Sequence, residues 1–183
     1  MAEHKIASTL LVGNDNIDFV LFQFAIDRAK MGQRVWVIAI KPFNEVPEGI
    51  EQPCKDVLKL ITFIYLSDFV ELMQHFNSIH KWKHTPNVII LKDFVHYCNL
   101  YDTKYDLRLA AFLSASLIDC LNFLAQKHGP NVLLLVSCKQ EENNVILLRN
   151  RLKVILDMYF DGIIDGTGLK SVDILQKIKT ICQ

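Results

Sequence analysis

Residues 6–40, IASTLLVGNDNIDFVLFQFAIDRAKMGQRVWVIAI, predict a strand, a helix and a second strand in that order. The apolar run at 6–12 ends at Gly13, and residues 19–31 carry apolar side chains at helical spacing until Gly32. Residues 35–40 are rich in β-branched side chains and stop at Lys41-Pro42. A strand, a helix and a strand in succession form a βαβ unit, from which parallel sheets are built.

The same alternation continues along the chain. Further strands are predicted at 60–65, 87–91, 131–138 and 159–164, with helices at 67–79, 105–127 and 147–158, the first of these capped by Ser67. The strands are continuous apolar runs, which indicates burial on both faces. We expect one α/β domain over residues 1–183, with a mostly parallel sheet between two layers of helices.

The last segment, 171–182, predicts a helix capped by Ser171, with apolar residues at helical spacing: Val172, Leu175, Ile178 and Ile181. If this helix does not fold back on the domain, it suits the groove of a partner.

Composition narrows the class of protein. Twenty basic residues balance twenty acidic ones, so no global field attracts nucleic acid or membranes. The five cysteines are widely spaced and lack zinc-ligand spacing, which favours reduced, mostly buried thiols and no metal site. The first residues have too short an apolar run for a signal peptide, and we expect no membrane span of ~20 apolar residues. A reducing compartment, nucleus or cytosol, follows.

The turn GNDNIDFV, between the first strand and the first helix, is the usual ligand position in such sheets. A phosphate loop there reads Gly-x-x-x-x-Gly-Lys-Ser/Thr. Gly13 is retained, but Asp18, Phe19 and Val20 stand where the second glycine, the lysine and the hydroxyl belong. These changes place a carboxylate against the phosphates and remove the cation and the magnesium ligand.

The second half of such a nucleotide site is altered as well. The apolar strand that should end in a magnesium-binding Asp ends in Lys92, and Asp93 comes one position late, where the side chain of a strand residue turns to the opposite face. We therefore expect no cofactor and no enzyme activity. Asp15 and Asp18 are interpreted as caps of the helix that follows.

The order of these parts resembles the RecA-like recombinase superfamily, and more specifically the ATPase-like subunit of the metazoan Shu complex. The resemblance covers about residues 5–165 and is carried by LLVGNDN (10–16), LFQFAIDRAKMGQRVWVIAIKPFNEVPEG (21–49), NVIILKDFVHYC (87–98) and LAAFLSASLIDCLNFLAQKHGPNVLLLVSCK (109–139). It implies a RecA-like three-layer core with a degenerate phosphate loop. It also implies a nuclear subunit that pairs with a SWIM-type zinc-finger protein and supports recombinase filament assembly on single-stranded DNA in homologous recombination repair.

The resemblance also implies candidate contact residues. Recombinases join one another through a Phe-x-x-Ala element whose side chains enter a pocket on the neighbour, and Phe22 with Ala25 match it directly after the phosphate loop. Phe112 and Ala115 match it too. Both pairs lie on helices whose apolar faces should pack on the sheet, so core packing is the favoured interpretation, more strongly for Phe112.

For DNA, the resemblance points to the loop after the 131–138 strand. That loop contains Lys139, with Arg149 and Arg151 nearby, while Lys81 and Lys83 flank Trp82 elsewhere. Single-strand binding needs a basic groove with aromatic side chains, and this loop lacks an aromatic residue. A solvated helix face is therefore favoured for Arg149, Arg151 and the nearby Lys153.

Two alternatives remain open at this stage. The first is an ATPase-like scaffold subunit of the Elongator type, in tRNA modification. The second is an enzyme on a Rossmann-like sheet, which would need polar residues clustered at the carboxyl ends of the strands. Ser137-Cys138 ends a strand as a nucleophile does, although a core position is favoured for Cys138.

Overall fold

The computed structural model describes residues 7–13, 16–43, 45–100, 106–129, 131–139, 153, 155 and 157–182. The strands are β1 (Ala7–Gly13), β2 (Val35–Ala39), β3 (Ile61–Tyr65), β4 (Val88–Leu91), β5 (Leu133–Lys139) and β6 (Gly162–Asp165). The helices are α1 (Ile17–Lys30), α2 (Lys55–Leu58), α3 (Phe69–Asn77), α4 (Phe94–Tyr97), α5 (Leu107–His128) and α7 (Ser171–Ile181), with a 3-10 turn η1 (Ile79–Lys81).

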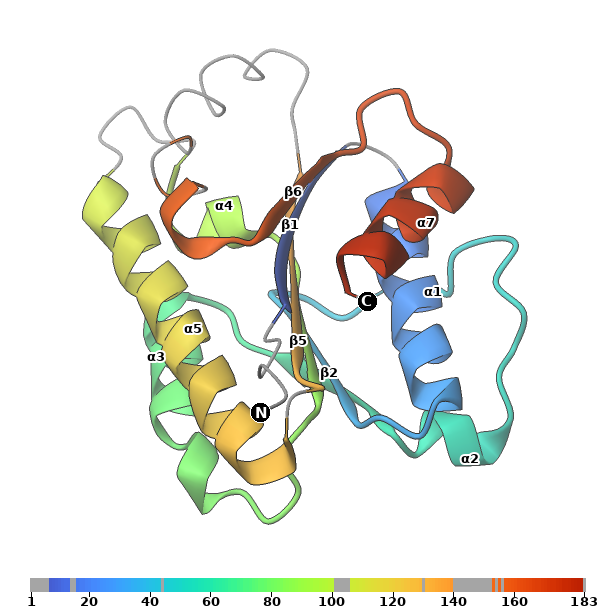
Figure 1. Ribbon diagram of the computed structural model, residues 1–183, viewed down its shortest axis with the longest axis horizontal. Coiled ribbons are helices and arrows are strands. Elements are labelled where there is room, and N and C mark those ends of the chain that lie inside the picture. Colours follow the sequence, from blue (N-terminus) through green and yellow to red (C-terminus); the bar gives the residue numbers. More distant parts are fainter. Residues whose placement is uncertain are drawn as a thin grey trace.

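All six strands belong to one parallel sheet, in the order β3-β2-β4-β5-β1-β6. The predicted α/β class is confirmed, with a three-layer core consistent with RecA-like and Rossmann-like proteins (Figure 1). The central strands are buried on both faces: Leu10 of β1 packs in the core on one side of the sheet and Leu11 in the core on the other. Because β4, β5 and β1 are parallel neighbours, their carboxyl ends lie side by side at the same end of the strands, the carboxyl edge of the sheet.

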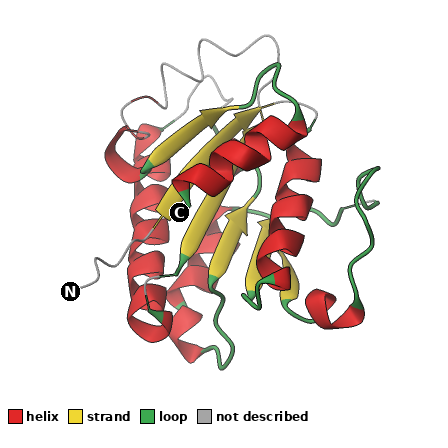
Figure 2. Cartoon of the chain, turned by 45° about the vertical axis from the view of Figure 1, so that its right-hand side comes forward, coloured by secondary structure: helices red, strands yellow, loops and turns green. Residues whose placement is uncertain are grey.

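Helices cover both faces of the sheet (Figures 1 and 2). On one face α3, α4 and α5 enclose the larger core, in which Phe94, Tyr97 and Leu121 are fully buried. On the other face α1 and α7 pack over the sheet through Leu21, Phe24 and Ile178. The two edge strands of the sheet are β3 and β6.

The last helix folds back on the domain. Ile174, Leu175 and Ile178 of α7 are buried in the core that α1 covers, so this helix has its apolar face occupied within the chain. Its N-cap is Lys170, not Ser171 as predicted, and no side chain caps it.

One further prediction is corrected, at the start of α3. The N-cap of α3 is Asp68 and not Ser67: its carboxylate accepts the Glu71 N–H at 2.9 Å, and the Glu71 carboxylate accepts the N–H and hydroxyl of Ser67. The predicted helix at 147–158 lies largely outside the described residues. Its described members, Lys153, Ile155, 157 and 158, are helical.

Helix α5 differs from what composition suggested about membrane spans. By length and apolar composition it could cross a membrane, contrary to the expectation that no stretch approached this. In the fold, α5 is a layer of the domain, and its apolar character follows from packing on the sheet through Leu113, Leu117, Leu121 and Leu124, all fully buried.

Candidate functional site

The turn between β1 and α1 holds the altered phosphate loop. Gly13 ends β1 and Asn16 is the N-cap of α1, so Asp18 lies inside the first helical turn; residues 14 and 15 are outside the described part of the chain. Asn16 makes no side-chain cap bond, and the carboxylate of Asp18 does not cap the helix as predicted. It contacts the ammonium of Lys92 instead, at 2.8 Å and 2.9 Å.

This ion pair joins the two altered halves of the nucleotide site. A helix amino terminus attracts anions because its first N–H groups are unpaired and the helix dipole is positive there. Asp18 supplies that anion from within the chain, and Lys92 supplies the matching cation. The Lys92 side chain is only 20% exposed, and its ammonium lies 4.6 Å from the centre of the Phe43 ring. The site is therefore electrostatically satisfied by the protein itself.

The other two altered loop positions are apolar contacts. Val20 is fully buried between α1 and the sheet. Phe19 is half-buried and packs against the same core. Neither position offers a group that could bind phosphate or magnesium.

Asp93 lies beside the ion pair in an unusual backbone conformation. Strand β4 ends at Leu91, and Asp93 has φ 63° and ψ 47°, the left-handed region, so the alternation of a strand does not set the direction of its side chain. Burial raises the pKa of the Asp93 carboxyl, an effect that the nearby cations Lys92 and Lys139 oppose. Its backbone N–H donates to the Ser137 hydroxyl at 3.4 Å.

The carboxyl edge thus gathers polar side chains from the first turn of α1, the end of β4 and the end of β5, as the enzyme alternative requires: Asp18, Lys92, Asp93, Ser137 and Lys139. A usable nucleophile is missing from this set. Ser137 and Cys138 are fully buried, and burial raises the pKa of the Cys138 thiol. Within the described ranges, no three His, Cys, Asp or Glu side chains are grouped to hold a metal ion.

The cysteines match their predicted state where the structure describes them. All five are free thiols; Cys98, Cys120 and Cys138 are buried, Cys182 is half-buried and Cys54 is exposed. Burial raises the pKa of the Cys120 thiol to about 12.

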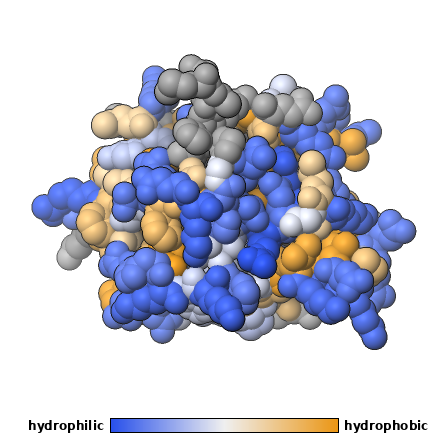
Figure 3. Space-filling view, turned by 60° about the horizontal axis from the view of Figure 1, so that its bottom comes forward, coloured by the Kyte–Doolittle hydropathy of each residue, from blue (hydrophilic) through white to orange (hydrophobic). Residues whose placement is uncertain are grey.

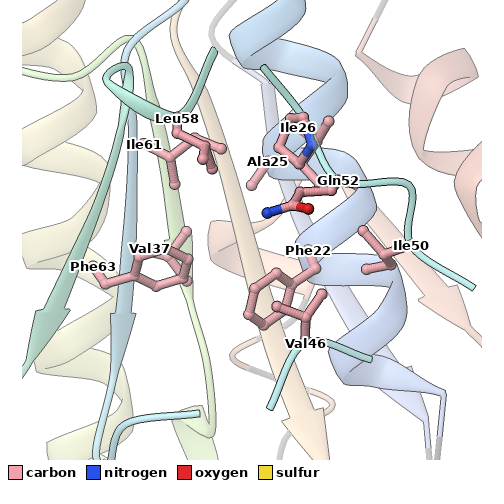
Figure 4. Close-up of a pocket in the computed structure, with 11 residues that line it drawn as sticks. Phe22, Ala25, Ile26, Val37, Val46, Ile50, Gln52, Leu58, Ile61 and Phe63 are labelled. Atoms are coloured by element: carbon pink, nitrogen blue, oxygen red, sulfur yellow. The ribbon is translucent and has the colours of Figure 1, made fainter. Parts of the chain in front are cut away.

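A groove of about 420 Å³ lies between α1 and the β2–β3 end of the sheet. In Figure 4, Phe22, Ala25 and Ile26 of α1 face Val37, Ile61 and Phe63 of the strands, and residues of the intervening loop lie in front. Among the lining residues that the structure describes, Gln52 is the one polar side chain. Figure 3 shows an apolar patch among charged side chains on the side of the molecule that carries α1 and α2.

The groove exists because the chain that connects β2 to β3 forms only a very short helix. A crossover in a doubly wound sheet normally lays a full helix over the strands that it joins. Here the crossover is an extended loop followed by α2, which has four residues and none buried (Figure 2). The apolar faces of β2 and β3 on this side are therefore covered by α1, the loop and the short α2, which contributes Val57 and Leu58.

An aromatic cluster connects the groove to the Asp18–Lys92 ion pair. The Phe22 ring lies 4.6 Å from that of Phe43 and 5.6 Å from that of Phe63, measured between ring centres. Phe43 is also the ring that Lys92 contacts. The ion pair, the aromatic cluster and the groove are thus contiguous.

The structure places the two Phe-x-x-Ala matches differently from the favoured interpretation. Phe22 is half-buried and Ala25 buried, and both form part of the wall of the groove instead of protruding from the surface. Phe112, for which core packing was favoured, is 57% exposed on the outer face of α5, and Ala115 is exposed beside it. The sequence pattern could not distinguish these because the exposed face of α5 carries apolar residues, such as Phe112, among its polar ones.

The predicted DNA contacts are not brought together. Lys139 ends β5 at the carboxyl edge, whereas Lys81 and Lys83 are exposed in the segment that leads into the amino end of β4. Trp82, between those lysines, packs partly on Trp36 with ring centres 5.6 Å apart. Arg149 and Arg151 lie outside the described residues. No single groove therefore combines the described candidates.

No protein-family model matches this chain, and a search of curated proteins finds no match. Any assignment of function therefore depends on the geometry described above and on the resemblance that the motifs carry.

Proposed function

We propose that this protein is a non-catalytic RecA-like subunit that pairs with a SWIM-type zinc-finger protein and supports recombinase filament assembly on single-stranded DNA. The observation that carries the proposal is the ion pair between Asp18 and Lys92. The chain has a carboxylate in the altered phosphate loop, and this carboxylate pairs with a cation that stands where the magnesium-binding Asp would be. A RecA-like sheet without a usable nucleotide site retains one general role, which is to present surfaces to partners.

The groove beside α1 is the surface that best supports the partner role. Its lining is almost wholly apolar, it is open to solvent at Leu58 and Val46, and it lies over strands left without a crossover helix. An exposed apolar groove is costly for an isolated domain and is typical of a binding site. We assign it to a protein partner, in keeping with the partner element that the resemblance implies at Phe22 and Ala25.

The exposed pair Phe112 and Ala115 supports a second contact. Three residues apart on α5, the two side chains lie on one face of the helix and share a hollow with Phe76 and Phe123. This arrangement suits the Phe-x-x-Ala recognition of a recombinase. The groove and the α5 surface lie on opposite faces of the sheet, so two partners could be held at once (Figure 1).

The first experiment is co-expression of the tagged chain with a SWIM-type zinc-finger protein and purification of the complex. We expect a stoichiometric complex that Leu58→Asp abolishes, because a carboxylate in an apolar groove must be desolvated without a partner. Leu107→Asp is the matched control, since Leu107 is similarly exposed, at 37% against 43%, and lies outside the groove. A wild-type chain that ignores the zinc-finger protein contradicts the proposal.

Binding assays on the purified complex then distinguish a role in recombination from a role in tRNA modification. Affinity for single-stranded DNA that falls with rising salt, together with retention of a recombinase, supports recombination. Retention of Elongator subunits instead would support the tRNA-modification alternative.

A further inference from the structure

The edge strand β3 has its backbone hydrogen-bonding groups divided between two sides. Val35 N–H of β2 donates to the Leu60 carbonyl at 2.8 Å, and Leu66 N–H donates to the Ala39 carbonyl at 3.0 Å. In a parallel pair alternate residues bond to one neighbour, so the even-numbered residues 60–66 face β2. The N–H and carbonyl groups of Ile61, Phe63 and Tyr65 therefore point away from the sheet.

This edge lacks the features that normally prevent strand pairing. Natural edge strands carry lysine, proline or a bulge, or are covered by another element. The sequence of β3, ITFIY, has no charge and no proline, and Phe63 and Tyr65 are 36% and 43% exposed. The other edge strand, β6, has four residues and ends in a charged Asp165. Of the two edge strands, β3 is therefore better suited than β6 to pair with another strand.

We propose that β3 pairs antiparallel with β3 of a second copy, about a two-fold axis at Phe63, so that the two sheets join into one. In this register Phe63 faces Phe63 of the second copy, and Ile61 faces Tyr65. All three outward-pointing residues then form hydrogen-bonded pairs, which is the full complement that this edge offers. Because the same strand serves both partners, the interface is closed and yields a dimer.

Charges at the two ends of β3 favour the antiparallel arrangement. The chain before β3 carries Lys55, Asp56 and Lys59, with a net positive charge, and the chain after it carries Asp68 and Glu71. Antiparallel pairing places the positive end of one strand beside the negative end of the other, with Lys59 opposite Ser67, whereas parallel pairing would place like charges together. Lys59 is 74% exposed, so it can reach the acidic residues of the second copy.

The side chains on the groove face add an apolar contact across the axis. Ile61 and Phe63 point toward the groove, and Phe63 packs on Phe22 and Phe43. Two Phe63 rings meeting at the axis would form a cross-strand aromatic pair, which stabilises antiparallel sheets. This dimer does not depend on the partner or on the process proposed above.

The test is the mass of the full chain in solution, measured by light scattering across a concentration series. We expect a wild-type dimer and a Phe63→Lys monomer, because the substitution places two like charges on the axis. Ile163→Lys, on the opposite edge strand and similarly exposed, should remain dimeric. Lys59→Glu should weaken the dimer about tenfold, since each substitution counts twice across the axis. Circular dichroism confirms that each variant is folded.

A cross-link tests the register without removing the interface. In a Cys54→Ser background, Phe63→Cys should form a disulfide-linked dimer on mild oxidation, because hydrogen-bonded antiparallel pairs lie within disulfide range. Ile163→Cys in the same background should not. A wild-type chain that stays monomeric throughout, a dimer that survives Phe63→Lys, or a dimer lost in Ile163→Lys overturns the proposal.

Discussion

At the scale of single residues, Asp18 and Lys92 neutralise each other's charge. A Lys92 side chain that is only 20% exposed would be costly without an anionic partner, and so would the Asp18 carboxylate beside the half-buried Asp93. Together the two charges cancel, and Phe43 shields the ammonium from water. The pair thus forms a structural contact between α1 and the end of β4.

The stability of Asp18→Asn tests this contact. The amide keeps the size of the side chain and removes its charge, so Lys92 loses its anionic partner. We expect the free energy of unfolding to fall by about 1 kcal/mol. The loss is modest because Asp18 is partly exposed and solvent screens its charge. Urea denaturation measures it. The control is Asp56→Asn, which breaks the exposed ion pair with Lys59 and should cost less than about 0.5 kcal/mol. Equal losses in both variants would show that the Asp18 pair is an ordinary surface contact.

The pH dependence of Asp93→Asn tests the buried carboxyl. Because burial raises the pKa of Asp93, the folded protein keeps this proton at pH values where the unfolded chain has released it. That contribution is fully present below the ordinary carboxyl pKa, about 4, and is lost as pH rises through the folded-state value. Asparagine stays neutral and tolerates the left-handed conformation.

We therefore expect Asp93→Asn to be more stable than the wild type at neutral pH, with the difference shrinking toward zero under acid conditions. Urea unfolding at a series of pH values gives this difference directly. Asp157→Asn, at an exposed position, should show none of this pattern. A variant that is less stable than the wild type at neutral pH would mean that Lys92 and Lys139 dominate over burial at this carboxyl.

Single residues also show what the sequence could predict about the site. The changes at Asp18, Phe19, Val20 and Lys92 could be recognised from the motif alone. The ion pair could not be predicted, because its partners are 74 residues apart and meet only after β1 and β4 are placed in one sheet.

At the scale of elements, the crossovers decide which surfaces are open. The crossover that contains α5 covers its side of the sheet with 22 helical residues, whereas the β2–β3 crossover leaves a groove. Every strand was predicted from its apolar run to within about three residues at each end, as is usual for such boundaries. The groove was not predicted, because an extended loop carries no pattern that shows what it leaves uncovered.

Helix periodicity likewise failed to tell which face of α5 is buried. Apolar residues occur on the exposed as well as the buried side of this helix, so the spacing of Phe112 and Ala115 fits either face. Only the packing of α3 beside α5 determines that Phe112 remains outside, with its ring centre 6.2 Å from that of Phe69.

The folded-back position of α7 can be tested by truncating its buried side chain. Ile178 is fully buried between α1 and the sheet, so Ile178→Ala should lower the free energy of unfolding by about 2–4 kcal/mol. Val172→Ala, on the exposed face of the same helix, should cost less than about 0.5 kcal/mol. Chemical denaturation of both variants measures the difference. Small and similar losses would mean that α7 is detached from the domain in solution.

At the scale of the whole molecule, the two outer faces carry different features. The side of α1 and α2 offers the apolar groove, and the opposite side, with α3 and α5 (Figure 1), offers the exposed Phe112 and Ala115. The edge of β3 offers outward-pointing backbone groups. Alternating strands and helices sufficed to predict the α/β class. The order β3-β2-β4-β5-β1-β6 needed the structure, because similar apolar strands do not specify which neighbours they pair with.

The central claim is that this domain acts by binding partners, since its own side chains close the site where a nucleotide would bind. The most direct test is a titration of the purified chain with a fluorescent ATP analogue in the presence of magnesium. The account predicts no saturable binding at millimolar nucleotide, because Asp18 repels the phosphates and Lys92 is already paired. Saturable binding that Lys92→Ala abolishes would contradict it, and would show that Lys92 leaves Asp18 to bind phosphate.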